Sequence, residues 1–140
     1  MAGVDSCLGG TEVADILIVE DEPSILSSLE FILKHAGWTI ESLTDGESAL
    51  NKLSSELPKA IVLDVMLPRR SGFEVLKEIR ANPRTSALPV LVLTAKGQQQ
   101  DRRTATELGA SEFITKPYSN AEVVEAIRRL LSGETRPDAG

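Results

Sequence analysis

The order of apolar and polar residues along the chain predicts an α/β fold. Short runs rich in β-branched residues are separated by stretches of ~10–14 residues in which apolar positions recur at helical spacing. The runs are apolar on both faces, as in central parallel strands that helices cover on each side. Five strands alternating with five helices indicate a doubly wound parallel sheet with right-handed crossovers. The predicted strands are residues 16–19, 39–43, 60–63, 89–93 and 112–115.

Residues with strong positional preferences mark the helix boundaries. Pro23 fits the first turn of the first predicted helix, because a missing N–H costs nothing there, and Gly37 offers a left-handed stop. Asp45 can cap the second helix. The helix over about residues 98–108 has only Ala105 and Leu108 as apolar anchors, so we expect it to pack most loosely.

Composition adds the scale and class of the protein. The chain has 140 residues, of which 41% are hydrophobic and 26% charged, as in one small globular domain. We expect that domain over residues 14–132, with a flexible leader at 1–13 and a flexible tail at 133–140. The net charge of −6 leaves no sequence-independent attraction to nucleic acid or anionic lipid. No direct nucleic-acid or membrane partner is therefore expected.

The cysteine content and the N-terminal sequence favour a cytoplasmic location. The single Cys7 cannot form a disulfide within the chain. No Lys or Arg precedes Lys34, so the charged start of a secretory signal is missing. No apolar run approaches the ~20 residues that a membrane helix needs.

Polar residues stand at the ends of four predicted strands. Glu20 and Asp21 follow the first strand, Asp64 the third, Thr94 the fourth and Lys116 the fifth. In doubly wound sheets, ligands bind outside the carboxyl ends of the strands. An acidic pair after a strand is by itself usually a helix cap, and a threonine there is commonplace. Their joint occurrence at successive strand ends favours one shared crevice.

Three carboxylates in one crevice imply a bound cation. Like charges disfavour each other's ionisation, so the cluster would destabilise the fold without a cation. Hard oxygen ligands that leave room for water suit Mg²⁺, held partly by protein carboxylates and partly by a phosphoryl oxygen. Lys116 adds a compact positive charge and Thr94 a hydroxyl donor. These groups together predict a site for Mg²⁺ and a phosphoryl group.

Four sequence motifs resemble those of a known family. The segments ILIVEDEP, IVLDVMLP, VLVLTA and FITKP occur in this order, and with this spacing they resemble the receiver domains of two-component response regulators. The resemblance runs from about residue 15 to residue 131, and four motifs in register are far more specific than any one of them. It implies the flavodoxin-like strand order 2-1-3-4-5.

The resemblance also implies a role for the acidic residues. Asp64 would accept a phosphoryl group from a phosphohistidine of a sensor histidine kinase or a histidine phosphotransfer protein. Asp21, Asp64 and the main-chain carbonyl of Met66 would bind Mg²⁺ directly, and Glu20 would act through a water molecule. Many members have aspartate where this chain has Glu20.

Signal output in this family follows from a change of surface shape. Lys116 would pair with the phosphoryl oxygens. Thr94 would hydrogen-bond one of them and move toward it while Phe113 swings inward, which switches a surface for a downstream protein target. Phe113 lacks the hydroxyl that many members carry there. The resemblance also implies a cis Lys116–Pro117 bond and a possible homodimer through the fourth helix, fifth strand and fifth helix.

Three other functions share parts of this pattern. A Mg²⁺-dependent phosphatase of the haloacid-dehalogenase type needs a second Asp two residues after the nucleophile, where this chain has Met66. A flavin-binding carrier needs a Ser/Thr/Gly-rich loop after the first strand, where this chain has EDEP. A degenerate receiver that serves as an interaction scaffold is disfavoured by the intact site residues. We expect a signalling domain that catalyses only its own phosphorylation and dephosphorylation, and not an enzyme with a separate substrate.

Overall fold

A five-stranded parallel sheet forms the centre of the structure, a computed structural model that describes residues 14–67, 71–94 and 99–132. Its strand order is β2-β1-β3-β4-β5, as expected from the family resemblance. The predicted leader, residues 1–13, and the predicted tail, residues 133–140, lie outside the described residues. The strands are β1 (Ile16–Val19), β2 (Ile40–Leu43), β3 (Ala60–Asp64), β4 (Val90–Thr94) and β5 (Glu112–Thr115).

The observed strand ends matter for the site. β3 and β4 each extend one residue further than predicted, to Asp64 and Thr94, so the backbone of both polar residues is held by the sheet. β4 begins at Val90 and not at Pro89, which has no N–H to donate to the ladder. Pro89 contributes its carbonyl instead, which accepts a hydrogen bond from Ile61 at 3.0 Å.

The helices begin and end close to the predicted residues. Pro23 is the first residue of α1, and Gly37, just beyond the helix, has a left-handed φ of 110°. The Asp45 side chain accepts a hydrogen bond from the backbone N–H of Ser48 at 2.7 Å and so caps α2. The helices are α1 (Pro23–His35), α2 (Gly46–Leu53), α3 (Gly72–Ala81), α4 (Gln99–Leu108) and α5 (Asn120–Ser132).

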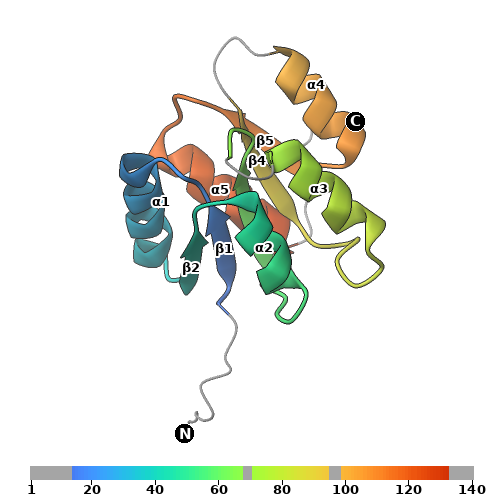
Figure 1. Ribbon diagram of the computed structural model, residues 1–140. Coiled ribbons are helices and arrows are strands. Elements are labelled where there is room, and N and C mark those ends of the chain that lie inside the picture. Colours follow the sequence, from blue (N-terminus) through green and yellow to red (C-terminus); the bar gives the residue numbers. More distant parts are fainter. Residues whose placement is uncertain (1–13, 68–70, 95–98, 133–140) are drawn as a thin grey trace, which may run out of the picture.

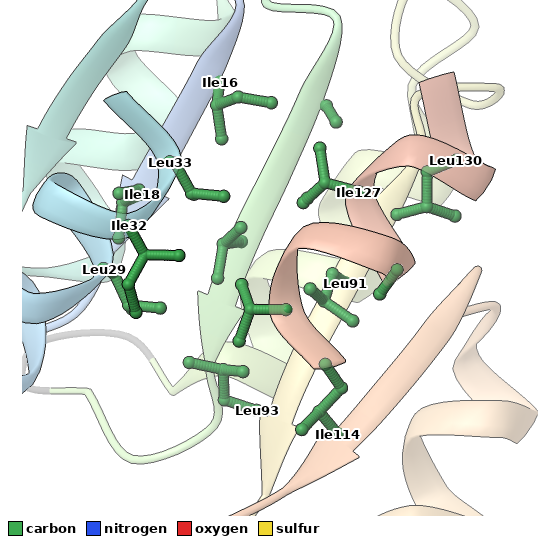
Figure 2. Close-up of a cluster of buried hydrophobic side chains, with 14 residues drawn as sticks. Ile16, Ile18, Leu29, Ile32, Leu33, Leu91, Leu93, Ile114, Ile127 and Leu130 are labelled. Atoms are coloured by element: carbon green, nitrogen blue, oxygen red, sulfur yellow. The ribbon is translucent and has the colours of Figure 1, made fainter. Parts of the chain in front are cut away.

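The helices cover the sheet in two layers (Figure 1). α1 and α5 pack on one face, and α2, α3 and α4 pack on the other. Successive strand residues point to opposite faces, so Ile16 and Ile18 lie in the first core cluster, whereas Leu17 and Val19 lie in the second. Figure 2 shows the first cluster, in which aliphatic side chains of α1 and α5 meet those of the strands.

α4 is anchored to the core by the two residues that the sequence predicts. Ala105 is fully buried and Leu108 is half-buried, and both pack in the second cluster. The predicted looseness of this helix follows from how few apolar side chains it offers. None of the helices in the described part of the chain is long and apolar enough to cross a membrane.

Arg80 joins three segments at the amino end of the sheet. Its Nε donates a hydrogen bond to the carbonyl of Gly109 at 2.8 Å. Its Nη1 donates to the carbonyls of Leu88 at 2.7 Å and Ser86 at 3.1 Å, and its Nη2 to Ser111 Oγ at 3.3 Å. The turn between α4 and β5 is thereby fixed to α3.

Candidate functional site

The strand register brings the predicted site residues to one edge of the sheet. Asp64 pairs with Leu93 across β3 and β4, and Thr94 pairs with Thr115 across β4 and β5. Neighbouring parallel strands therefore end at nearly the same level of the sheet, and the residues that follow them lie close together. This edge gathers Glu20, Asp21, Asp64, Thr94 and Lys116.

Asp64 has a buried carboxylate with one hydrogen bond on each oxygen. Only 3% of the residue is exposed. Oδ2 accepts a hydrogen bond from Lys116 Nζ at 3.1 Å, and Oδ1 accepts one from the backbone N–H of Met66, also at 3.1 Å. The two contacts fix the orientation of the carboxylate. The Lys116–Pro117 peptide bond is cis, as predicted.

Glu20 is a second buried carboxylate, and only one of its two oxygens accepts a hydrogen bond from the described residues. Its Oε2 accepts a hydrogen bond from the backbone N–H of Glu22 at 3.1 Å. Its Oε1 lies 3.6 Å from Lys116 Nζ and has no hydrogen-bond partner among the described residues. Burial and the neighbouring Asp64 carboxylate raise the pKa of Glu20 to about 7. Burial is the larger cause, and the like charge of Asp64 adds to it in the direction that the sequence predicts.

Asp21 completes a group of three carboxylates. Oxygen atoms of Glu20, Asp21 and Asp64 all lie within 4.8 Å of one another, and Asp21 is exposed to solvent. One ammonium faces the cluster, and the buried Glu20 Oε1 beside it accepts no hydrogen bond from the described residues. Such a set of oxygen donors fits a hard divalent cation. The backbone N–H of Met66 donates a hydrogen bond to Asp64, and the residue is 71% exposed.

Gly72, the first residue of α3, supports the site and was missed by the sequence reasoning. A Cβ at this position would lie 2.2 Å from the carbonyl oxygen of Asp64 and 2.6 Å from Val65 Cα. Its N–H donates to the carbonyl of Val65 at 3.0 Å. α3 can start against the end of β3 only because no side chain intervenes. The glycine marks a helix start in the sequence, but not the strand that it touches.

The two predicted switch residues have side-chain partners of their own. Thr94 is fully buried, and its hydroxyl donates to Thr115 Oγ1 at 3.4 Å. Phe113 is half-buried, and the guanidinium carbon of Arg102 lies 4.8 Å from the centre of its ring. Neither Thr115 nor Arg102 belongs to the predicted set, because only the paired strands and α4 bring them close.

Tyr118 is a further residue that the sequence reasoning missed. It is half-buried and packs against the core cluster of α1 and α5. Burial and the negative charges of Glu20 and Asp64 raise the pKa of its phenol to about 12, so the group is neutral at physiological pH. Its position just after Lys116–Pro117 was the feature of the sequence that could have indicated its closeness to the site.

The sequence is similar to those of proteins from a known family. The family model described as the response regulator receiver domain matches residues 16–128. The alkaline phosphatase synthesis transcriptional regulatory protein PhoP of Bacillus subtilis is 42% identical over 116 residues, which cover 83% of this chain and 48% of that protein. The chain spans about half the length of the curated relatives it matches.

Solved structures of other proteins have the same fold as this chain. The signal receiver domain of a signal transduction histidine kinase from Syntrophus aciditrophicus has a TM-score of 0.81 and 33% identity, with 91% of this chain and 97% of that chain covered. The receiver domain of the sensor histidine kinase PA1611 from Pseudomonas aeruginosa has a TM-score of 0.80 and 29% identity, with 86% and 99% covered. The latter structure has a magnesium ion coordinated in its active site cleft.

Proposed function

Because the chain belongs to the response regulator receiver domain family, we propose that Asp64 accepts a phosphoryl group from a phosphohistidine of a partner kinase. One observation carries this proposal: the buried Asp64 carboxylate lies 3.1 Å from the Lys116 ammonium and in one cluster with Glu20 and Asp21. Aspartate is an established covalent carrier of phosphoryl groups. The neighbouring cation and acidic cluster supply what such a carrier needs.

The transfer requires a nucleophile, a cation and a hydrogen-bond donor. An Asp64 oxygen bonds to phosphorus as the P–N bond of the phosphohistidine breaks, and the electron pair of that bond returns to the imidazole. The transition state is loose, so positioning and charge neutralisation supply most of the catalysis. Lys116, which already donates a hydrogen bond to Asp64, pairs with the phosphoryl oxygens. Thr94 turns its hydroxyl toward one of them.

Mg²⁺ belongs to the same proposal. Asp21, Asp64 and the Met66 carbonyl would hold it, with Glu20 acting through a water molecule. When bound, it would neutralise the charge of the transferring group. Glu20 Oε1, which accepts no hydrogen bond from the described residues, and the raised pKa of Glu20 support a cation at this place. The magnesium ion in the PA1611 receiver supports it by analogy.

Two alternatives are less well supported. A phosphatase of the haloacid-dehalogenase type lacks its general acid here, since the exposed Met66 carries a thioether that has no proton to give. A phosphorylation-independent scaffold leaves the costly burial of Asp64 and Glu20 without a purpose. We therefore propose that the domain catalyses only its own phosphorylation and dephosphorylation.

Intact-mass measurement tests the phosphoacceptor directly. The protein is incubated with acetyl phosphate and Mg²⁺, and the expected result is a mass gain of one phosphoryl group that Asp64→Asn abolishes. Asp15→Asn is the matched control, because Asp15 pairs with Lys59 and Thr39 and not with the site. No adduct in the natural chain, or an adduct that persists in Asp64→Asn, would contradict the proposal.

The proposed partners are a sensor histidine kinase or a histidine phosphotransfer protein, and a downstream protein target. The Bacillus subtilis relative is named as a transcriptional regulatory protein, so the expected absence of a nucleic-acid partner does not extend to that whole relative. We restrict it to this acidic domain, whose net charge is −6. A cytoplasmic location is part of the same proposal.

A homodimer through α4, β5 and α5 is also proposed. An open hollow of about 440 Å³ lies on this face, and both basic and acidic side chains, including Arg102 and Glu122, line it. A patch of mixed charge can complement a second copy of itself. Sedimentation of the phosphorylated and unphosphorylated protein tests this, and an unchanged monomer in both states would contradict it.

A further inference from the structure

Phe113 and Arg102 stand together between two surface hollows. One hollow, of about 440 Å³, opens toward α5, and Glu122 and Arg129 contribute to its lining. The other, of about 490 Å³, lies along α4, with Arg103 on its wall. Both hollows are lined by Phe113 and by Arg102. The half-buried ring therefore faces the surface, with the guanidinium beside it.

The contact between the two side chains is a cation–π interaction. The Arg102 guanidinium carbon lies 4.8 Å from the centre of the Phe113 ring, within the range in which the ring quadrupole attracts a cation. Phenylalanine has no hydroxyl with which to form a hydrogen bond. The ring face is thus the part of this side chain that can take part in a polar interaction.

Arg102 also links β5 to the first turn of α4. Its helix begins at Gln99, and the buried anchor Ala105 comes a turn later. The opposite end of α4 is fixed separately, since Arg80 holds the carbonyl of Gly109. The ring contact therefore relates the orientation of Phe113 to the position of the part of α4 nearest in sequence to Thr94.

We propose that Arg102 is a positioning residue that holds Phe113 in its surface-facing orientation and so sets how readily phosphorylation moves it. This role rests on the proposed function of Asp64. An exposed cation–π contact biases a two-state side chain by about two- to fivefold. A bias of this size is large enough to define the resting orientation, and small enough for a phosphoryl group to overcome.

Phosphorylation of variants by acetyl phosphate and Mg²⁺ tests the role. We expect Arg102→Met to raise the phosphorylated fraction at limiting phosphodonor by about two- to fivefold. Arg102→Lys keeps the cation and should stay near the natural chain. Arg103→Met removes the same charge from the next residue, which lines the second hollow, and should have no effect. In Phe113→Leu, the additional Arg102→Met change should also have no effect.

Proton NMR of the unphosphorylated protein gives a second, independent measurement. The Arg102 side-chain resonances should be shifted upfield by the Phe113 ring, and Phe113→Leu should remove the shift. Absence of the shift, equal effects of Arg102→Met and Arg103→Met, or an effect that persists without the ring would overturn the role of Arg102. An effect that disappears on dilution would assign it to association and overturn the role too. A natural chain that gains no phosphoryl mass would remove the proposed function itself.

Discussion

Lys116 Nζ donates a hydrogen bond to Asp64 Oδ2 at 3.1 Å and thereby connects the end of β3 to the segment after β5. The same ammonium lies 3.6 Å from Glu20 Oε1. One cation thus faces two buried carboxylates, with the exposed Asp21 nearby. The charge balance of the site is incomplete in this arrangement, and the first three predictions follow from that imbalance.

Replacement of Lys116 should slow the phosphorylation of Asp64. Lys116→Met removes the ammonium that neutralises the transferring group, and we expect the rate with acetyl phosphate to fall by about a hundredfold. Lys59→Met is the matched control, because Lys59 pairs with Asp15, outside the site. Rates are compared by intact mass over time. A Lys116→Met protein as fast as the control would show that this cation does not assist the transfer.

The stability of the metal-free protein should depend on pH through Glu20. Its pKa is about 7 in the folded state, against an ordinary value of 4.5 for a glutamate side chain. Between these values the folded chain keeps a proton that the unfolded chain releases, so stability falls as pH rises from about 4.5 to about 7. The loss is on the order of 3 kcal/mol. Glu20→Gln stays neutral, so it should exceed the natural chain in stability at pH 8 and match it near pH 4.5.

Urea unfolding in EDTA at these two pH values measures the difference. Glu107→Gln, on the exposed side of α4, is the control and should show no such change between the two pH values. If Glu20→Gln differs from the natural chain by the same amount at both pH values, protonation of Glu20 does not contribute to stability.

Mg²⁺ should stabilise the folded chain. A ligand that binds only the folded state adds about 2.7 kcal/mol at a concentration a hundredfold above its dissociation constant. The rise in unfolding temperature should be lost in Asp21→Asn, which removes the exposed carboxylate of the cluster. It should persist in Asp15→Asn. Equal thermal shifts in all three proteins would exclude Asp21 as a ligand.

Gly72→Ala should impair folding and phosphorylation together. The new methyl group would meet the carbonyl oxygen of Asp64 at 2.2 Å, and relief of this overlap must move α3 or the end of β3. We expect a loss of about 1–3 kcal/mol, typical of overpacking, and a slower transfer to Asp64. Gly37→Ala, at a left-handed position with open space around it, should lower stability alone. Chemical unfolding and phosphorylation rates together distinguish the two outcomes.

Much of the fold is predictable from local sequence. β-branched runs define all five strands to within one residue, because buried parallel strands need apolar side chains on both faces. The site residues are predictable for a related reason. All strands of a parallel sheet end at the same edge. The position of Asp64 or Thr94 after an apolar run therefore predicts that its side chain lies at that edge.

Other contacts depend on how helices pack against strands that are distant in sequence, which no local pattern predicts. The contact of Gly72 with Asp64 depends on how α3 packs, and that of Arg102 with Phe113 on how α4 lies over β5. The same holds at the amino end of the sheet, away from the site: Arg80 lies in the last turn of α3, yet it donates hydrogen bonds to the carbonyl of Leu88 and to that of Gly109, which is 29 residues away. Such residues are recognised only once the elements have been placed in space.

The alternation of strand residues between the two core clusters has a consequence for how the protein can be tested. A slip of β3 by one residue against β1 would exchange its side chains between the two core clusters, where they would not match the neighbouring side chains, and would also displace Asp64 from Lys116. Core and site therefore fail together under such an error. Only chains with the correct strand register would gain phosphoryl mass at Asp64. A phosphodonor assay can therefore distinguish correctly paired chains from compact chains in which the strands are mispaired.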